Sequence, residues 1–369
     1  MLLTYARLHR LRLPLVTSFR TSFGTEAYRN ALLIEVVGPD TAGWGECVAE
    51  LEPLYTPEYT DGAAHVITHF LLPRINGSAV EASGLHKLFL PVKGHQMAKA
   101  SIEAAVLDAE CRLNGTSLSA RLGGKTDLVP AGVAVGICDS LGALLDTVEG
   151  YVSQGYGRIK LKIEPGNDIA QVSAVREKFP DVLLQVDANS AYRIGDVRHL
   201  AQLDAFGLLL LEQPLPDDDL SGHAELAKYI ETPICLDESI GSPSDAHDAI
   251  LIGACQVINI KPGRVGGYLE AVKIHDLCVH AGIAVWCGGM LETGVGRAGN
   301  LALAALPGFT LPGDLSASDR YFHHDVTDAF VLEDGHIRVP TGPGIGVTPL
   351  RDRVAQFTVS TQTVALSSS

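Results

Sequence analysis

The sequence has no apolar run long enough to cross a bilayer, no Cys-x-x-Cys pair and no excess of basic residues. Its 28 lysines and arginines stand against 43 aspartates and glutamates, and the net charge of −15 argues against a nucleic acid or an anionic membrane as partner. The seven cysteines are scattered, which argues against a disulfide framework and against a structural zinc. Residues 1–15 alternate apolar residues with arginines, which predicts a strand rather than a secretion signal. We therefore expect a cytoplasmic protein with reduced thiols.

The length of 369 residues allows two domains, each with its own core. Residues 1–125 begin with strand-like runs and continue with helical patterns, of which the clearest covers residues 97–112. Strands followed by a block of helices indicate a small α+β domain. The strand-like runs are residues 3–13, 31–37 and 44–49.

Residues 126–314 change to short apolar runs that alternate with helix-sized segments. Eight such runs predict an α/β domain with a parallel sheet closed into a barrel, and an open doubly wound sheet is the alternative. Beyond residue 315, Asp334-Gly335 predicts a hairpin turn, and this segment is expected to pack back on the first domain. The last ten residues, rich in Ser and Thr, are expected to form a loose tail. The eight runs are residues 133–137, 159–163, 182–186, 208–211, 234–236, 257–260, 283–286 and 309–311.

Five ionisable residues share one spacing along these runs. Successive members are 25, 25, 25 and 24 residues apart, and each lies at or just after the C-terminal end of a run. Because the C-terminal ends of barrel strands meet at one mouth, the five side chains are expected to face a single cavity. One charged residue at a strand end is usually structural, since the chain leaves the core there, but five at one period favour a common site. They are Lys162, Asp187, Glu212, Asp237 and Lys261.

The three carboxylates at the centre of this series predict a cation site. Left bare on adjacent strand ends, they would repel one another strongly. Oxygen ligands without His or Cys select a hard cation, Mg²⁺ or Mn²⁺ rather than zinc. Such a cation would also bind a substrate carboxylate and stabilise the charge that develops when the neighbouring carbon loses its proton. Asn189 and Glu238 stand beside two of the ligands and are candidates to support them, although a plain structural role is equally open.

The lysines at the two ends of the series predict proton transfer. Lys160 and Lys162 point to the same face of one strand, and adjacent ammonium groups would lower the pKa of Lys162 towards that of a useful base. Arg264 is placed to act similarly on Lys261. If these two lysines close the second and sixth of eight strands, they stand on opposite sides of the barrel. A substrate between them could lose a proton to one face and regain it from the other, which suits racemisation, and the pair also suits a dehydration.

The five residues stand in the motifs Lys160-Leu-Lys162, Val186-Asp187-Ala-Asn189, Leu211-Glu212-Gln-Pro214, Leu236-Asp237-Glu238-Ser239 and Asn259-Ile-Lys261-Pro-Gly-Arg264. Through these motifs the chain resembles the enolase superfamily over nearly its full length. The resemblance implies a modified (β/α)7β barrel (residues 126–314) under an α+β capping domain built from both termini (residues 1–125 and 315–369). It also implies Asp187, Glu212 and Asp237 as Mg²⁺ ligands and a lysine pair as acid and base, which is known chemistry of that superfamily.

Lysines on both sides resemble the muconate-lactonizing-enzyme-like subgroup, and no histidine follows the seventh run at Trp286-Cys287-Gly288-Gly289. Dipeptide epimerases of this subgroup carry Asp-x-Asp after the eighth strand, whereas this chain has Asp314-Leu-Ser316. Residues 19–25 and 287–300 are most similar to the branch of o-succinylbenzoate synthase and N-succinylamino acid (N-acylamino acid) racemase. The resemblance thus implies a small carboxylate substrate, dehydration for menaquinone biosynthesis or racemisation, and a homo-oligomer. A dipeptide epimerase or a muconate-type cycloisomerase is the alternative.

Further residues are predicted to contact substrate, and two rival functions stay open. Phe19, Phe23 and Tyr55 are candidates for a lid from the capping domain, although aromatic residues there are more often core. Gly294-Val-Gly296-Arg-Ala-Gly299 matches a dinucleotide fingerprint, but weakly, because it follows the seventh run rather than the first. A carboxylate- or metal-binding protein on a decayed barrel is the non-enzyme alternative. The remaining candidates for substrate contact are Gly289, Met290, Asp314 and Ser316.

Overall fold

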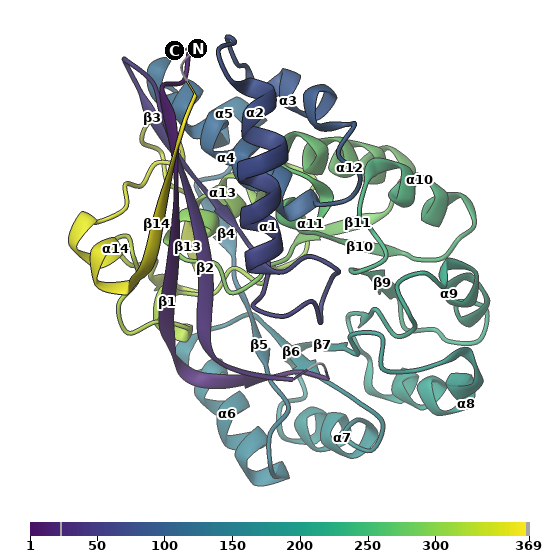
Figure 1. The fold of residues 1–369 in the computed structure, drawn as a ribbon. Coiled ribbons are helices and arrows are strands. Elements are labelled where there is room, and N and C mark those ends of the chain that lie inside the picture. Colours follow the sequence, from purple (N-terminus) through teal and green to yellow (C-terminus); the bar gives the residue numbers. More distant parts are fainter. Residues whose placement is uncertain (23, 367–369) are drawn as a thin grey trace.

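The alternating N-terminal segment forms the long strand β1 (Tyr5–Arg20) in the computed structural model, which describes residues 1–22 and 24–366 (Figure 1). Ala6 and Leu8 are buried, and beyond a shift in the pairing with β14 the buried positions move to Leu11 and Leu13. The sheet is antiparallel, in the order β14-β1-β2-β3. Its other strands are β2 (Thr25–Val37), β3 (Ala42–Cys47) and β14 (Thr358–Ala365).

The expectation of a loose C-terminal tail is wrong for residues 360–365. They belong to β14, which pairs with β1 from Tyr5↔Ala365 to Leu11↔Thr358. Thr and Val are favoured in strands, and the free edge of β1 offers backbone partners that the composition of the tail does not reveal. In Figure 1 the purple first strand and the yellow last strand run side by side. Residues 367–369 lie outside the described residues.

The N-terminal helices include the one that the sequence predicts most clearly, α4 (Gln96–Leu113). It packs on β3 so closely that a Cβ at Gly43 or Gly45 would overlap the backbone of the helix. The helix is therefore buried over most of its surface, with alanines towards the sheet. The other helices of this part are α1 (Thr60–Val66), the π-helix η1 (Ile67–Leu71), α2 (Leu72–Ile75), α3 (Ala82–Phe89) and α5 (Leu118–Leu122).

Short apolar runs form the predicted parallel sheet, whose order β11-β10-β9-β8-β7-β6-β5 follows the chain without reversal. A doubly wound sheet requires such a reversal, so that alternative is wrong. The sheet closes through residues 309–314, since Phe309 bridges Val285 beside one edge and Gly313 bridges Ala131 beside the other. The strands are β5 (Gly132–Val135), β6 (Arg158–Lys162), β7 (Leu183–Asp187), β8 (Leu211–Glu212), β9 (Ile234–Leu236), β10 (Val257–Ile260) and β11 (Ala284–Cys287).

Helices connect these strands and lie outside them, as Figure 1 shows for α6 to α10. They are α6 (Leu141–Gln154), α7 (Ile169–Lys178), α8 (Val197–Leu200), α9 (Leu220–Leu226), α10 (Pro243–Leu251), α11 (Pro262–Val265), α12 (Tyr268–Ala281) and α13 (Gly294–Ala304). Short 3-10 helices are η2 (Ile194–Asp196), η3 (Ala201–Phe206) and η4 (Ser318–Arg320).

A small second antiparallel sheet carries the predicted hairpin turn. Asp334 and Gly335 have φ angles of 47° and 77°, as a two-residue hairpin turn requires. The hairpin also pairs with a strand that precedes the barrel, so the C-terminal segment is fastened at both of its ends. The elements are β12 (Leu332–Glu333), β13 (His336–Arg338) and β4 (Leu128–Pro130), followed by α14 (Arg351–Phe357).

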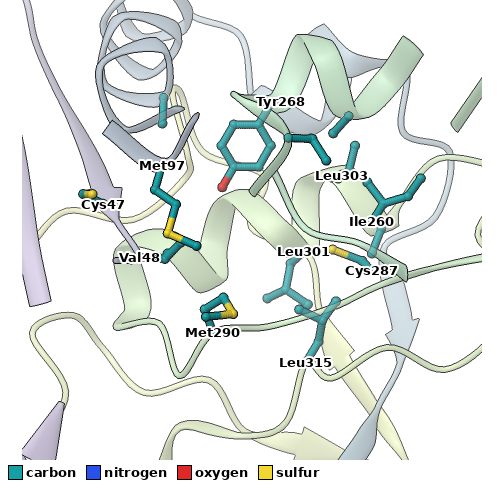
Figure 2. Close-up of a cluster of buried hydrophobic side chains, with 14 of the residues drawn as sticks. Cys47, Val48, Met97, Ile260, Tyr268, Cys287, Met290, Leu301, Leu303 and Leu315 are labelled. Atoms are coloured by element: carbon teal, nitrogen blue, oxygen red, sulfur yellow. The ribbon is translucent and has the colours of Figure 1, made fainter. Parts of the chain in front are cut away.

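The capping domain and the barrel share one apolar core. Figure 2 shows Cys47, Val48 and Met97 from the capping domain beside Ile260, Tyr268 and Leu301 from the barrel. A Cβ at Gly263, at the start of α11, would overlap the side chain of Val48. This contact fixes how the capping domain sits over the barrel. The exact division of the chain at residues 125 and 314 stays a prediction.

Buried carboxylates of the capping domain also bind the N-termini of two barrel helices. Glu103 of α4 accepts hydrogen bonds from the backbone of Tyr268 at 2.6 Å and of Leu269 at 2.9 Å, where α12 begins. Glu46 of β3 likewise accepts from the backbone of Thr293 and Gly296 at the start of α13, each at 3.1 Å. A carboxylate at a helix N-terminus satisfies free N–H groups and meets the positive end of the helix dipole.

The glycine-rich start of α13 is the segment that matches the dinucleotide fingerprint. Its free N–H groups are occupied by carboxylates of the protein itself, Glu46 and also Asp325, which accepts from Gly294 N at 2.8 Å. A Cβ at Gly299 would overlap the hydroxyl of Tyr268. The glycines thus serve close packing, and the nucleotide hypothesis has no open phosphate site here.

Replacing Glu103 by Gln is expected to change how stability depends on pH. Burial raises the pKa of Glu103 to about 8, so the folded state binds its proton more tightly than the unfolded state does. The parent protein should then lose stability as the pH rises from about 5 to 9, because folding must keep a charge buried. Glu103→Gln loses one hydrogen bond, about 1 kcal/mol at pH 6, but lacks the part of this decline that Glu103 causes. Urea unfolding at pH 6 and pH 9 measures how the unfolding free energy of the parent and of Glu103→Gln changes with pH. An equal change in the two proteins would contradict the expectation.

Candidate active site

The strand register places the five equally spaced residues at one end of the barrel. Lys162 and Asp187 end neighbouring strands and pair in register, and Asp187 pairs with Glu212 at the end of the next strand. Asp237 and Lys261 directly follow the last residues of β9 and β10. The predicted common mouth is therefore confirmed. The two lysines come from the second and sixth strands, β6 and β10, on opposite sides of the barrel.

A cavity of about 730 Å³ lies between this mouth and the capping domain. Most residues predicted from the sequence line it: Phe19, Tyr55, Lys160, Lys162, Asn189, Lys261, Gly289, Met290 and Asp314. The carboxylates Asp187, Glu212 and Asp237 are fully buried side chains at the strand ends, Arg264 is buried as well, and Glu238 is half-buried. Ser316 is buried away from the described cavity lining, and Phe23 lies outside the described residues.

Two segments of the capping domain reach the barrel mouth. The tip of the β1–β2 hairpin is fixed by Ile137 N, which donates to Arg20 O at 3.0 Å, and by Ser22 Oγ, which donates to Asn189 O at 3.4 Å. The loop after β3 brings Tyr55 down to the lysine on β10. The lid predicted from the aromatic residues thus has two arms, one at each side of the cavity. Direct contact of Phe19 and Tyr55 with substrate stays a prediction.

Lys162 is held by side chains of the next strand end. Its Nζ donates to Asp187 Oδ2 and to Asn189 Oδ1, both at 2.6 Å. Asn189 in turn donates to Glu238 Oε1 at 2.9 Å, and its own backbone N–H donates to Asp187. Its φ angle of 41° is unusual for a residue other than glycine, so the local structure holds this side chain in place. Asn189 therefore orients Lys162 towards the cavity.

Lys160 lies deeper and is surrounded by carboxylates. Its Nζ is 2.5 Å from Asp314, 3.0 Å from Glu212 and 3.1 Å from Asp187. Burial alone would lower the pKa of Lys160, but these carboxylates raise it well above its usual range. Lys160 is thus a compensated cation within the acidic cluster. These carboxylates balance its charge in this arrangement, and its predicted effect on Lys162 stays a prediction.

Lys261 stands at the other side, between Asp237 and the capping domain. Its Nζ donates to Asp237 Oδ2 at 2.8 Å and to the Tyr55 hydroxyl at 3.0 Å. Arg264 binds Asp237 and donates to the same hydroxyl at 3.1 Å. Burial alone would lower the pKa of Lys261, but Asp237 and Tyr55 raise it well above its usual range. The predicted lowering by Arg264 is present but is outweighed by Asp237 in this arrangement.

Replacing Tyr55 by Phe is expected to lower catalytic efficiency about 3- to 10-fold, the effect of losing one hydrogen bond of about 0.5–1.5 kcal/mol to a catalytic group. The loss should appear in kcat and in its pH profile, because the hydroxyl contacts Lys261 and Arg264. Steady-state kinetics between pH 6 and pH 10 would measure it. Tyr28→Phe is the control, since Tyr28 lines the same cavity with its ring against Arg12. Equal behaviour of the two variants would contradict the role of Tyr55.

The central carboxylates have the chemistry of a cation site. Burial and repulsion by Asp187 raise the pKa of Glu212 to about 8, and burial with repulsion by Asp237 raises that of Glu238 to about 8. Glu238 Oε2 is buried and has no hydrogen-bond partner in the described structure. In the part of the chain that the structure describes, no three such side chains converge as a finished metal cluster, and Asp187, Glu212 and Asp237 are bonded to Lys and Arg instead. The donor set therefore fits a hard cation, provided that these carboxylates turn from their present partners.

Three polar residues of this network were not predicted from the sequence. Asn259 donates to Glu212 Oε1 at 2.7 Å, and Gln213 Oε1 accepts from the backbone of Asp237 at 2.9 Å. Arg158 lies 2.8 Å from Asp314 and is fully buried. The sequence could have indicated each of them. Asn259 and Arg158 stand two positions before predicted site residues, so their side chains point to the same face of the strand. Gln213 follows a predicted ligand directly and has a φ angle of 37°.

Comparison with known proteins agrees with this geometry. Residues 143–353 match the family model described as enolase C-terminal domain-like, and the chain belongs to the enolase superfamily. It is 57% identical to an N-succinylamino acid racemase of Amycolatopsis sp, over 98% of both chains, and 46% identical to an o-succinylbenzoate synthase of Geobacillus kaustophilus, over 96% of this chain and 95% of the relative. The crystal structure of an enolase superfamily member from Listeria innocua superposes with a TM-score of 0.95 at 42% identity, over 99% of this chain and 100% of that one. The resemblance predicted from the motifs is confirmed.

Proposed function

We propose that this chain removes the proton next to a substrate carboxylate and works as an N-succinylamino acid (N-acylamino acid) racemase, an o-succinylbenzoate synthase, or both. The observation that carries the proposal is the placement of Lys162 and Lys261 on opposite strands, with both side chains lining one cavity. The volume of about 730 Å³ suits a small molecule. Relatives named as this racemase and this synthase, at 57% and 46% identity, support both activities.

Asp187, Glu212 and Asp237 would hold Mg²⁺, with Mn²⁺ able to replace it. When bound, the cation supplies positive charge beside the substrate carboxylate, where negative charge develops as the proton leaves. The ammonium group of Lys160 compensates part of the negative charge of the acidic cluster. Asn189 keeps Lys162 in position once Asp187 turns to the cation. Loss of Asp237 as its partner would favour the neutral amine of Lys261.

In the racemase reaction, the neutral amine of one lysine takes the α-proton and the ammonium of the other returns a proton to the opposite face. The carbon–hydrogen bond breaks on one side and forms on the other, so no further reactant is needed. In the synthase reaction, one lysine takes the proton and its ammonium form then gives that proton to the departing hydroxyl group, which leaves as water, while the other lysine stabilises the developing charge. Closure by the two capping arms excludes water and strengthens these interactions.

Asp314 favours an N-acylated substrate over the dipeptide of an epimerase. It is the acidic residue of the segment Asp314-Leu-Ser316, where dipeptide epimerases hold the free amino group. It is bound to Lys160 at 2.5 Å and to Arg158 at 2.8 Å, which leaves it no charge for a further cation. An acylated nitrogen carries no charge and needs no such partner. A muconate-type cycloisomerase remains the second alternative that this site chemistry allows.

Deuterium exchange tests the proposal directly. The protein with Mg²⁺ and an N-succinyl amino acid in heavy water should place deuterium on the α-carbon, and parallel rates on the cyclohexadiene precursor would separate racemase from synthase. No exchange with any acylated amino acid, together with no dehydration, would reject the proposal and favour a binding protein. No helix in the described chain is long and apolar enough to cross a membrane. We also propose a cytoplasmic homo-oligomer, which light scattering of the purified protein can test.

A further inference from the structure

One carboxylate in the substrate cavity has no part in the network described above. Glu50 follows β3 and lines the cavity from the capping domain. Its backbone is fixed, because Thr60 N and Thr60 Oγ1 both donate to Glu50 O at 2.8 Å. The side chain is half-buried and has no hydrogen bond or ion pair with any described residue. The fold therefore presents an unpaired carboxylate to the substrate from a rigid position.

The surroundings of Glu50 do not neutralise it. Burial and then the neighbouring Glu26 raise the pKa of Glu50, while Arg29, Lys261 and Lys162 lower it from a distance, and the net pKa is about 7. Both lysines are already bonded to aspartates of the barrel. An unpaired, partly desolvated carboxylate is costly unless something donates to it. The donor that fits is a substrate group.

The cavity has walls of opposite charge. Lys162 and Lys261 lie on the barrel wall, where the substrate carboxylate and α-carbon must sit for proton transfer. Glu26, Glu50 and Glu52 lie on the capping wall, and the cation there, Arg12, is stacked on Tyr28 at 4.0 Å. A substrate with a carboxylate at one end and a cation at the other would match both walls. An amino acid whose nitrogen is acylated can carry such a cation only on its side chain.

We propose that Glu50 determines substrate specificity by selecting N-acyl amino acids with a cationic side chain, of the lysine or arginine type. This inference rests on the racemase function proposed above and goes on to its substrate class. Glu50 would also favour the racemase substrate over the synthase substrate, because the cyclohexadiene substrate of the synthase carries carboxylates and no cation. Glu50 is not used in proton transfer, so its contribution lies in binding the remote end of the substrate.

Two substrates with the same four-carbon side chain provide the test. N-succinyl-lysine carries a positive charge at the end of its side chain and N-succinyl-norleucine does not. The rate of α-proton exchange at pH 8 is measured with each substrate. The parent protein is expected to favour the lysine derivative in kcat/KM about tenfold or more, which is the effect of a hydrogen bond to a charged group. Glu50→Gln is expected to lower kcat/KM for the lysine derivative at least tenfold more than for norleucine. Glu177→Gln, an exposed change on α7, should leave the preference of the parent intact.

The possible outcomes separate this inference from the function on which it rests. If the parent exchanges both substrates equally, or if Glu50→Gln keeps the preference for lysine, the role of Glu50 is overturned while the racemase function stands. If the parent exchanges no acylated amino acid, the proposed function fails and the inference fails with it. The preference of the parent protein needs no variant, so the test holds even if Glu50→Gln folds poorly.

Discussion

Replacing Lys162 or Lys261 with alanine is expected to abolish racemisation, a loss of at least ~10²–10⁴-fold for each general acid or base. The two residues approach the cavity from opposite strands, so neither can take over the role of the other. Polarimetry or chiral chromatography with an N-succinyl amino acid would measure the loss. Lys178→Ala, on the outer helix α7 and paired with Glu149, is the matched control.

Deuterium exchange should distinguish the two lysine variants from each other. Each variant keeps one lysine, so each is expected to exchange the α-proton of one enantiomer only, and the enantiomer should differ between Lys162→Ala and Lys261→Ala. The physical reason is that a proton leaves towards the lysine on its own side of the carbon. If either variant racemises at nearly the parental rate, or if both exchange the same enantiomer, the two-sided arrangement is wrong.

Removal of divalent cations is expected to eliminate activity, and addition of Mg²⁺ or Mn²⁺ to restore it. The acidic cluster also offers a readout without turnover, because a cation that binds only the folded state raises the unfolding free energy by about 2.7 kcal/mol at a hundredfold excess over Kd. Thermal unfolding with and without Mg²⁺ would measure this effect. Glu212→Gln should weaken it, because Glu212 is buried between Asp187 and Asp237 and is the most repelled of the three.

Glu177→Gln is the matched control for the cation experiment, since it removes an exposed carboxylate on α7. Two results would argue against a cation at these residues. One is full activity after exhaustive chelation. The other is an equal shift of the unfolding temperature by Mg²⁺ in the parent protein and in Glu212→Gln.

The fold and the ionisable centre of the site could be predicted from the sequence because both follow local rules. Apolar runs between helix-sized segments mark parallel strands, and the end of each strand locates the residue that faces the mouth. Lys162 and Asp187 illustrate this, since each is the last residue of its strand. Motifs then connect these positions to the enolase superfamily.

Other features depend on partners far away in the chain and could not be predicted. The strand β14 exists because β1 has a free edge, and the tail alone gives no sign of it. The sequence shows that Lys160 shares a strand face with Lys162, but it does not show that the packing surrounds Lys160 with three carboxylates. Glu50 looks like an ordinary loop residue in the sequence, because only the fold shows that it lines the cavity and has no hydrogen bond or ion pair with a described residue.

The pairing of β14 with β1 has a consequence for protein synthesis. The strand β14 follows the barrel in the chain whereas β1 precedes it, so β14 leaves the ribosome long after its partner. Until then, the edge of β1 is unpaired and open to other chains, as exposed strand edges generally are. A nascent or C-terminally truncated chain would thus hold a translated barrel beneath an unfinished cap, prone to associate with its neighbours. Completion of the last strand both protects that edge and finishes the sheet that carries one wall of the substrate cavity.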